Sequence, residues 1–200
     1  MMLVLASRSP RRSDILRGMG YAFVVDSADV DESVLVGESP RDHVQRLAVA
    51  KCLRVASRQP HDAVVLAADT TVDVDGEILG TPRDVSHARE MLRRLSGRTH
   101  LVHTAVCVAH RATHDVGLDT ASVTMHPIAP DALERYLTTG ESLDTAGAYA
   151  LQGEAAVFVR ELYGERSTVV GLPVPVVRRL LDRHGVAHQT LGLSPDATRP

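Results

Sequence analysis

Aromatic residues and cysteines are scarce in this chain. Its 200 residues include no Trp, two Phe, four Tyr and two Cys. So few aromatic rings argue against a protein that stacks the bases of single-stranded nucleic acid on its side chains. The net charge of -3, from 22 basic and 25 acidic residues, argues against a broad surface for the backbone of DNA or RNA. We therefore expect no nucleic-acid partner.

Long apolar runs are also absent. The N-terminal apolar run ends at Ala6, which is too short for a signal peptide. No other run approaches the roughly 20 apolar residues of a membrane-spanning helix. Cys52 and Cys107 form neither a close pair nor a metal-ligand pattern, and are typical of buried thiols in a reducing compartment. These features predict a cytoplasmic protein without a membrane partner.

Several signatures of hydrolases and nucleotide-binding proteins are missing. The chain has no P-loop, no Gly-x-Gly-x-x-Gly fingerprint, no Gly-x-Ser-x-Gly elbow and no His-Glu-x-x-His zinc motif. Their absence argues against P-loop NTPases, Rossmann dehydrogenases, serine hydrolases and zinc proteases of these types.

Helices and strands are expected to alternate along the chain. Ser9-Pro10 and Ser39-Pro40 each predict a helix start, with serine as N-cap and proline in the first turn. Asp75-Gly76 predicts a hairpin. The class is therefore α/β, with a mixed, twisted sheet flanked by helices. Expected helices are 10–19, 40–53, 87–95, 131–138 and 174–184; expected strands are 3–6, 22–25, 63–68, 72–74, 78–79, 100–109 and 117–125, with one or two more within 155–170.

The helix that starts at Pro10 carries two cations in its first turn, Arg11 and Arg12. Cations are unfavourable at a helix N-terminus unless an anion is near, whereas free backbone N–H groups make such a terminus an anion site. Ser7, in the loop before the helix, belongs to the same segment. The alternative is an exposed basic helix start that pairs with acidic residues elsewhere; taken alone, the segment fits both.

Asp69 and Thr70 follow the apolar run 63–68, so Asp69 is expected at the C-terminal end of a buried strand, where α/β ligand sites gather. A carboxylate there can bind Mg²⁺ or orient a water molecule. The alternative is an ordinary turn residue. Glu32 in a polar loop and Lys51 within a helix carry no separate signal, since such residues are usually solvated.

A small apolar segment between Gly147 and Gly153 contains one amide side chain, Gln152. Because an amide offers a donor and an acceptor together, it can match the O4 and N3–H edge of uracil or thymine. The alternative is a glutamine that satisfies backbone groups at a turn.

The ordered set of segments resembles the Maf family of nucleotide pyrophosphatases over nearly the whole chain. Each segment alone is short, but the order makes the set specific. The segments are residues 5–12, 31–32, 46–51, 67–70, 95–104, 140–153 and 169–173.

The resemblance implies a two-lobed fold of the Maf and inosine-triphosphatase type with a central cleft, and a reaction of nucleoside triphosphate with water that gives monophosphate and pyrophosphate. It implies a divalent cation, Mg²⁺ or Mn²⁺, and a homodimer. We expect one such domain over 1–186 and a loosely ordered tail over 187–200. By position, Asp69 matches the proton acceptor. The phosphate and metal positions match Ser7, Arg11, Arg12, Glu32 and Lys51, with Glu32 and Asp69 as metal ligands.

The family divides by substrate at three positions. The family pattern has Arg, Thr and Gln at these positions in the branch that acts on dTTP and UTP. It has Trp, Gln and Glu there in the branch that acts on 7-methyl-GTP. This chain has Arg11, Thr70 and Gln152, which indicates a pyrimidine nucleotide. The family is known for removal of non-standard nucleotides (house-cleaning) and for links to cell division.

One position departs from the family pattern. The chain has Thr81 where the family usually has a lysine after the hairpin, and Arg83 is the nearest cation that could replace it. Two alternatives stay open: a pyrophosphatase for another or modified nucleotide and, because of the Thr81 departure, a regulator that binds nucleotide with little turnover.

Overall fold

The computed structural model describes residues 1–188; most of the expected tail, residues 189–200, lies outside the described residues. A seven-stranded sheet has the order β2-β1-β3-β5-β6-β7, with β4 paired to β3. β1 pairs in parallel with β2 and β3, and the other pairs are antiparallel, which confirms the mixed α/β class. The strands are β1 Leu3–Leu5, β2 Val24–Val25, β3 Val64–Val74, β4 Glu77–Leu79, β5 Thr99–His110, β6 Thr113–Met125 and β7 Val159–Tyr163. The helices are α1 Pro10–Gly18, α2 Pro40–Ala56, α3 Val85–Leu95, α4 Pro130–Thr138, α5 Arg166–Val170 and α6 Val174–Arg183, with 3-10 turns η1 Glu141–Asp144, η2 Ala146–Ala148 and η3 Glu154–Phe158.

Helices α1 and α2 begin where the sequence predicts. The Ser9 hydroxyl accepts a hydrogen bond from the Arg12 N–H, and the Ser39 hydroxyl accepts one from the Asp42 N–H. Each capping serine is followed by proline, whose missing N–H costs nothing in a first turn. The hairpin turn has φ of 55° at Asp75 and 85° at Gly76, as a two-residue turn of this kind requires.

The prediction that a strand ends at Asp69 is wrong. Strand β3 continues to Val74 because its second half pairs with β5, and Asp69 lies opposite Ala105 in that ladder. The parallel neighbour β1, however, makes its last pair between Leu5 and Leu66. Asp69 therefore lies in the middle of β3 but beyond the end of β1. On the side of β3 where β1 has ended, there is room for a site next to Asp69.

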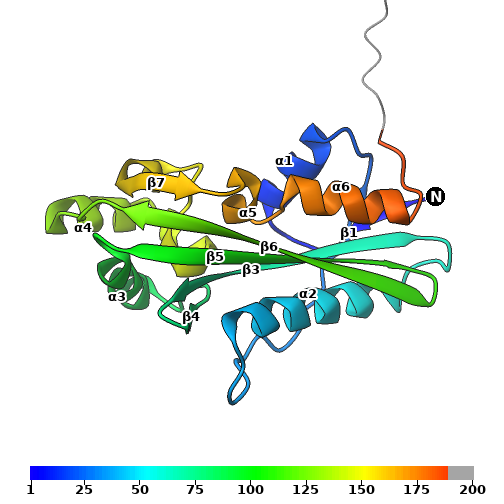
Figure 1. Cartoon of the computed structure of the whole chain (residues 1–200), viewed down its shortest axis with the longest axis horizontal. Coiled ribbons are helices and arrows are strands. Elements are labelled where there is room, and N and C mark those ends of the chain that lie inside the picture. Colours follow the sequence, from blue (N-terminus) through cyan, green and yellow to red (C-terminus); the bar gives the residue numbers. More distant parts are fainter. Residues whose placement is uncertain (189–200) are drawn as a thin grey trace, which may run out of the picture.

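The first lobe packs helices on both faces of the sheet: α1 and α6 lie on one face and α2 on the other (Figure 1). Side chains of β3 alternate between these faces. Leu66 and Ala68 pack with the helices α1 and α6, whereas Val65 and Ala67 pack with α2. Burial on both faces explains why residues 63–68 are apolar without interruption.

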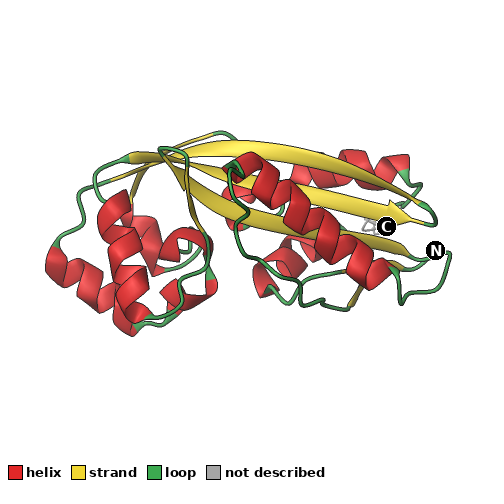
Figure 2. Ribbon diagram, turned by 90° about the horizontal axis from the view of Figure 1, so that it is seen from below, coloured by secondary structure: helices red, strands yellow, loops and turns green. Residues whose placement is uncertain are grey.

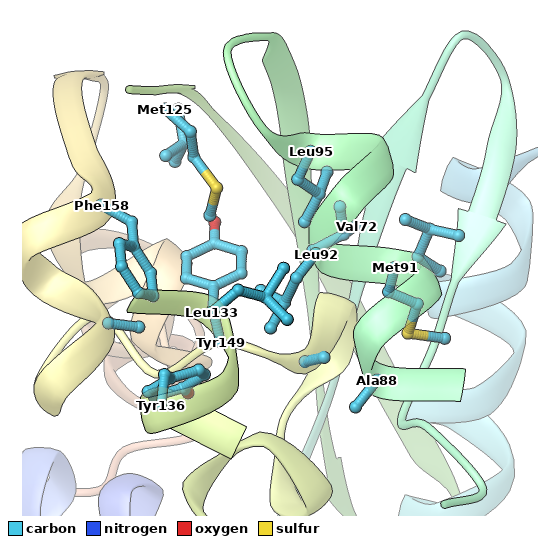
Figure 3. Close-up of a cluster of buried hydrophobic side chains, with 14 of the residues drawn as sticks. Val72, Ala88, Met91, Leu92, Leu95, Met125, Leu133, Tyr136, Tyr149 and Phe158 are labelled. Atoms are coloured by element: carbon cyan, nitrogen blue, oxygen red, sulfur yellow. The ribbon is translucent and has the colours of Figure 1, made fainter. Parts of the chain in front are cut away.

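The strands β3, β5 and β6 continue into a second lobe, and Figure 2 shows the helices in two groups along them. The core of this lobe joins α3 and α4 to the end of β6, with Leu92, Leu133, Tyr136 and Met125 among its members (Figure 3). The expected two-lobed shape is confirmed. Within residues 1–188 no helix has both the length and the apolar character needed to cross a bilayer.

Candidate active site

A cleft of about 510 Å³ lies between the two lobes. Its walls come from the β1–α1 loop, the loop after β2, the middle of α2, the middle of β3 and the segment between η2 and η3. Tertiary structure thus gathers residues as far apart in the sequence as Ala6 and Val170. Every predicted site residue lines the cleft: Ser7, Arg11, Arg12, Glu32, Lys51, Asp69, Thr70 and Gln152.

Lys51 stands between the two carboxylates of the cleft. Its Nζ lies 2.6 Å from Asp69 Oδ1 and 2.7 Å from Glu32 Oε1. The Asp69 side chain is 9% exposed and that of Glu32 is 57% exposed. Burial raises the pKa of Asp69, and the positive charges of Lys51 and Arg12 oppose that rise. A carboxylate whose pKa is raised is better suited to accept a proton near neutral pH.

The Arg12 guanidinium is held by three oxygen atoms. Nε donates to the carbonyl of Gly171 at 2.9 Å, one terminal nitrogen donates to Ser7 Oγ at 3.3 Å, and the other donates to Thr70 Oγ1 at 3.2 Å. Burial lowers the pKa of Arg12, and the negative charge of Asp69 opposes this effect. Arg12 therefore holds a fixed positive charge against the floor of the cleft.

Behind Thr70 lies a buried threonine that the sequence shows only as part of the family motif. Thr104 Oγ1 lies 2.9 Å from Thr70 Oγ1 and donates to the carbonyl of Thr168 at 2.7 Å. The Thr70 hydroxyl must therefore donate to Thr104 and is left to accept from Arg12. The turn at Gly171, for which the sequence suggests no chemistry, supplies the carbonyl that orients Arg12.

Arg11 reaches across the cleft. Its Nη2 donates to the carbonyl of Asp144 in η1 at 2.7 Å. Within residues 1–188, neither Arg11 nor Arg12 forms a salt bridge to a carboxylate within 4.0 Å, so the alternative of a basic helix start paired with acidic residues does not describe this helix. Both cations remain available to an anion in the cleft.

Gln152 lies on the second lobe, close in sequence to Tyr149 of that lobe's core. Its side chain is exposed, and it makes no hydrogen bond to another residue in the described part of the chain. The neighbouring residues Tyr149, Ala150 and Leu151 are buried and line the same cleft with Gln152. One end of the cleft is therefore charged, and the other combines apolar surface with one free amide.

The two carboxylates bear on metal binding. Among residues 1–188 no three His, Cys, Asp or Glu side chains are grouped so that they could hold a metal ion by themselves. Glu32 and Asp69 nevertheless share one cation, the Lys51 ammonium. Mg²⁺ is commonly held by one or two carboxylates together with substrate phosphates and water. The site therefore fits an ion that takes two ligands from the protein and the rest from substrate and water, and does not form a complete protein cage around a metal.

Thr81 lines the cleft, whereas Arg83 does not. The Arg83 backbone N–H donates to His87 Nδ1 at 3.2 Å, at the start of α3. The suggestion that Arg83 replaces the missing cation thus has no support in the geometry. A neutral side chain occupies this position of the cleft wall.

Comparison with known proteins finds relatives over nearly the whole chain. The family description "Maf-like protein" matches residues 2–184. A dTTP/UTP pyrophosphatase of Anaeromyxobacter dehalogenans is 49% identical, over 92% of this chain and 94% of that protein. A protein of the same name from Methylobacillus flagellatus is 46% identical, also over 92% and 94%.

Among solved structures, the Ham1 protein of Staphylococcus aureus aligns over 94% of this chain and 92% of its own, with 14% identity and a TM-score of 0.47. The assignment rests on the sequence matches, which span almost the entire length of both partners. The chain belongs to the Maf family.

Proposed function

We propose that this protein hydrolyses pyrimidine nucleoside triphosphates, dTTP and UTP, to the nucleoside monophosphate and pyrophosphate. The observation that carries the proposal is the polarity of the cleft: a carboxylate paired with a lysine and flanked by two arginines at one end, and a free glutamine amide at the other. The names of the relatives at 46% and 49% identity support the same activity.

In this proposal the triphosphate binds on the first lobe. Arg11, Arg12 and Lys51 offset its charge, and the Ser7 hydroxyl accepts from Arg12 and can donate to a phosphate oxygen. Binding of the anion displaces part of the Lys51 contact with the carboxylates. Positioning and electrostatic stabilisation carry most of the catalysis in phosphoryl-group reactions, so fixed cations are the main requirement.

Asp69 is the proposed catalytic residue. It orients the attacking water and accepts its proton, and its raised pKa suits this role. Glu32 and Asp69 are the proposed ligands of a divalent cation, Mg²⁺ or Mn²⁺, which when bound supplies charge stabilisation on the phosphate oxygens. The water oxygen forms a bond to the α-phosphorus, the bond to the bridging oxygen breaks, and pyrophosphate leaves.

The base is proposed to lie on the second lobe. The Gln152 amide donates to O4 and accepts from N3–H of uracil or thymine, and Thr70 binds the substrate from the cleft floor. A cytosine presents the reverse pattern at these positions and pairs with Gln152 only when the amide is turned over.

The test is product analysis with purified protein, UTP and Mn²⁺. UMP with pyrophosphate is the expected result, and an Asp69→Ala variant should lose it. UDP with phosphate would refute cleavage between the α- and β-phosphates. Parallel assays with dTTP, CTP, 7-methyl-GTP and ITP rank the substrates, and UTP binding without turnover would favour a regulatory role.

We further propose that the protein acts in the cytoplasm as a homodimer. A size measurement in solution tests the homodimer.

A further inference from the structure

The segment that carries Gln152 is fastened to the rest of the second lobe by the carboxylate of Glu141, in η1. Glu141 Oε2 accepts a hydrogen bond from the backbone N–H of Glu154 at 3.0 Å. Because this N–H lies two residues after Gln152, the contact fixes the backbone on the C-terminal side of the amide that the proposed function uses.

The same carboxylate occupies the space that a side chain at position 153 would need. A Cβ at Gly153 would lie 2.1 Å from Glu141 Oε2 and 2.6 Å from its Cδ. The backbone at Gly153 is extended, with φ of -108° and ψ of -157°, a region open to other residues. A larger residue at position 153 would therefore push the Glu141 carboxylate, the far end of a flexible side chain, out of its contact with the Glu154 N–H.

Two further side chains hold the N-terminal side of the segment. The backbone N–H of Ala150 donates to Tyr136 Oη at 3.3 Å, and Leu151 accepts from Arg166 at 3.4 Å. Both contacts are longer than the Glu141 contact. Within residues 1–188 the Gln152 side chain has no hydrogen bond, so its position depends on the backbone of the segment. That backbone is held by these contacts and by a turn hydrogen bond from the Gly153 N–H to the Ala150 carbonyl at 3.0 Å.

We infer that Glu141 is a positioning residue that sets the base preference of the cleft by holding Gln152 in place. The inference rests on the proposed function, in which Gln152 reads the edge of uracil or thymine. A displaced amide loses its hydrogen bonds to the base, whereas Arg12 and Lys51 are held by groups outside η1. Arg11 does reach η1, but through the backbone carbonyl of Asp144 and not through the Glu141 side chain. The effect is therefore confined to the base end of the nucleotide.

The kinetic test compares Glu141→Ala with Glu141→Gln and Glu154→Ala. Glu141→Ala should raise KM for UTP about tenfold with a smaller effect on kcat, because roughly one to two hydrogen bonds to the base are lost. It should also reduce the preference for UTP over CTP, while inhibition by inorganic tripolyphosphate, which has no base, stays unchanged. Glu141→Gln keeps an acceptor oxygen and should restore most of the preference. Glu154→Ala removes a neighbouring carboxylate but keeps the N–H, and should resemble the wild type.

A second test needs no substrate. Gly153→Ala should lower the melting temperature in the wild-type background, where the new Cβ meets the carboxylate, and should lower it much less in the Glu141→Ala background. Equal losses in the two backgrounds would overturn the proposed contact. If Glu141→Ala does not fold, Glu141→Asp, which is shorter by one methylene, takes its place in both tests.

The two levels of the proposal fail in different ways. Unchanged KM and UTP preference in Glu141→Ala, with an active wild type, would overturn the positioning role alone. Absence of UTP turnover in the wild type would overturn the proposed function and the base-reading role with it. In that case the melting-temperature comparison still reports on the contact between Glu141 and Gly153.

Discussion

A lysine at position 81 should make this protein a faster enzyme. Thr81 lines the cleft directly after Gly80, whose carbonyl accepts the Gly147 N–H at 3.1 Å. That hydrogen bond holds the backbone after β4 against η2, so the backbone position of residue 81 is fixed. Thr81→Lys would bring one more cation to the wall of a cleft that must bind a triphosphate.

The size of the gain follows from the charge of the partner. A hydrogen bond to a charged group contributes about 1.5–3 kcal/mol, and each 1.4 kcal/mol changes a rate about tenfold. Because Thr81 is exposed and solvent weakens the interaction, we expect the lower limit, an increase of about tenfold in kcat/KM for UTP. The gain should shrink as ionic strength rises.

The assay is release of pyrophosphate under steady-state conditions, with two matched variants. Thr81→Gln adds length without charge and should bring no gain. Arg83→Ala should leave kcat/KM unchanged, because Arg83 does not line the cleft. The reasoning is refuted if Thr81→Lys changes kcat/KM less than twofold, or if Thr81→Gln gains as much.

Three further outcomes are expected. Asp69→Asn should lower kcat at least about 100-fold with unchanged circular dichroism; near-normal turnover would remove Asp69 from the mechanism. Burial lowers the pKa of His100 from 6.5 to about 4, so the unfolded state binds the proton first and the unfolding free energy should fall by about 2 kcal/mol from pH 6.5 to 5. When the unfolding free energy is measured by urea titration at each pH, His100→Gln should lose this part of the pH dependence. An unchanged pH dependence would contradict the role of His100. Gly147→Ala places a Cβ 2.7 Å from Val72 Cγ2 at a φ of 69° and should destabilise the fold by about 2–4 kcal/mol; Val72→Ala should recover part of that loss, and a neutral Gly147→Ala would refute the clash.

Local signals in the sequence were reliable where a short segment sets its own structure. The Ser-Pro helix starts and the Asp75-Gly76 hairpin depend on nearest neighbours, and all three occur as predicted. The length of β3 is different. The sequence predicts strands at 63–68 and 72–74 but does not show that residues 69–71 join them into one strand, because these residues pair with β5, 32 to 36 positions away.

For the candidate site, too, some features could be predicted from the sequence and others could not. Its residue types and their order along the chain were readable, and the family resemblance named all eight positions. By contrast, Thr104 and Gly171 are visible in the sequence only as members of the family's motifs, and nothing there indicates what the Thr104 hydroxyl or the Gly171 carbonyl does. Their roles appear only when strands and turns distant in the chain bring them to Arg12 and Thr70.

The sequence alone therefore determined the α/β class, the local starts and turns and the family of this protein, because these depend on composition, periodicity and short motifs. Tertiary structure decided that Lys51 lies between Asp69 and Glu32, that Arg83 stays outside the cleft and that Glu141 holds the segment of Gln152. Each of these depends on the distance between side chains far apart in the chain, which is set only when β3, β5 and β6 pair and the two lobes form around them.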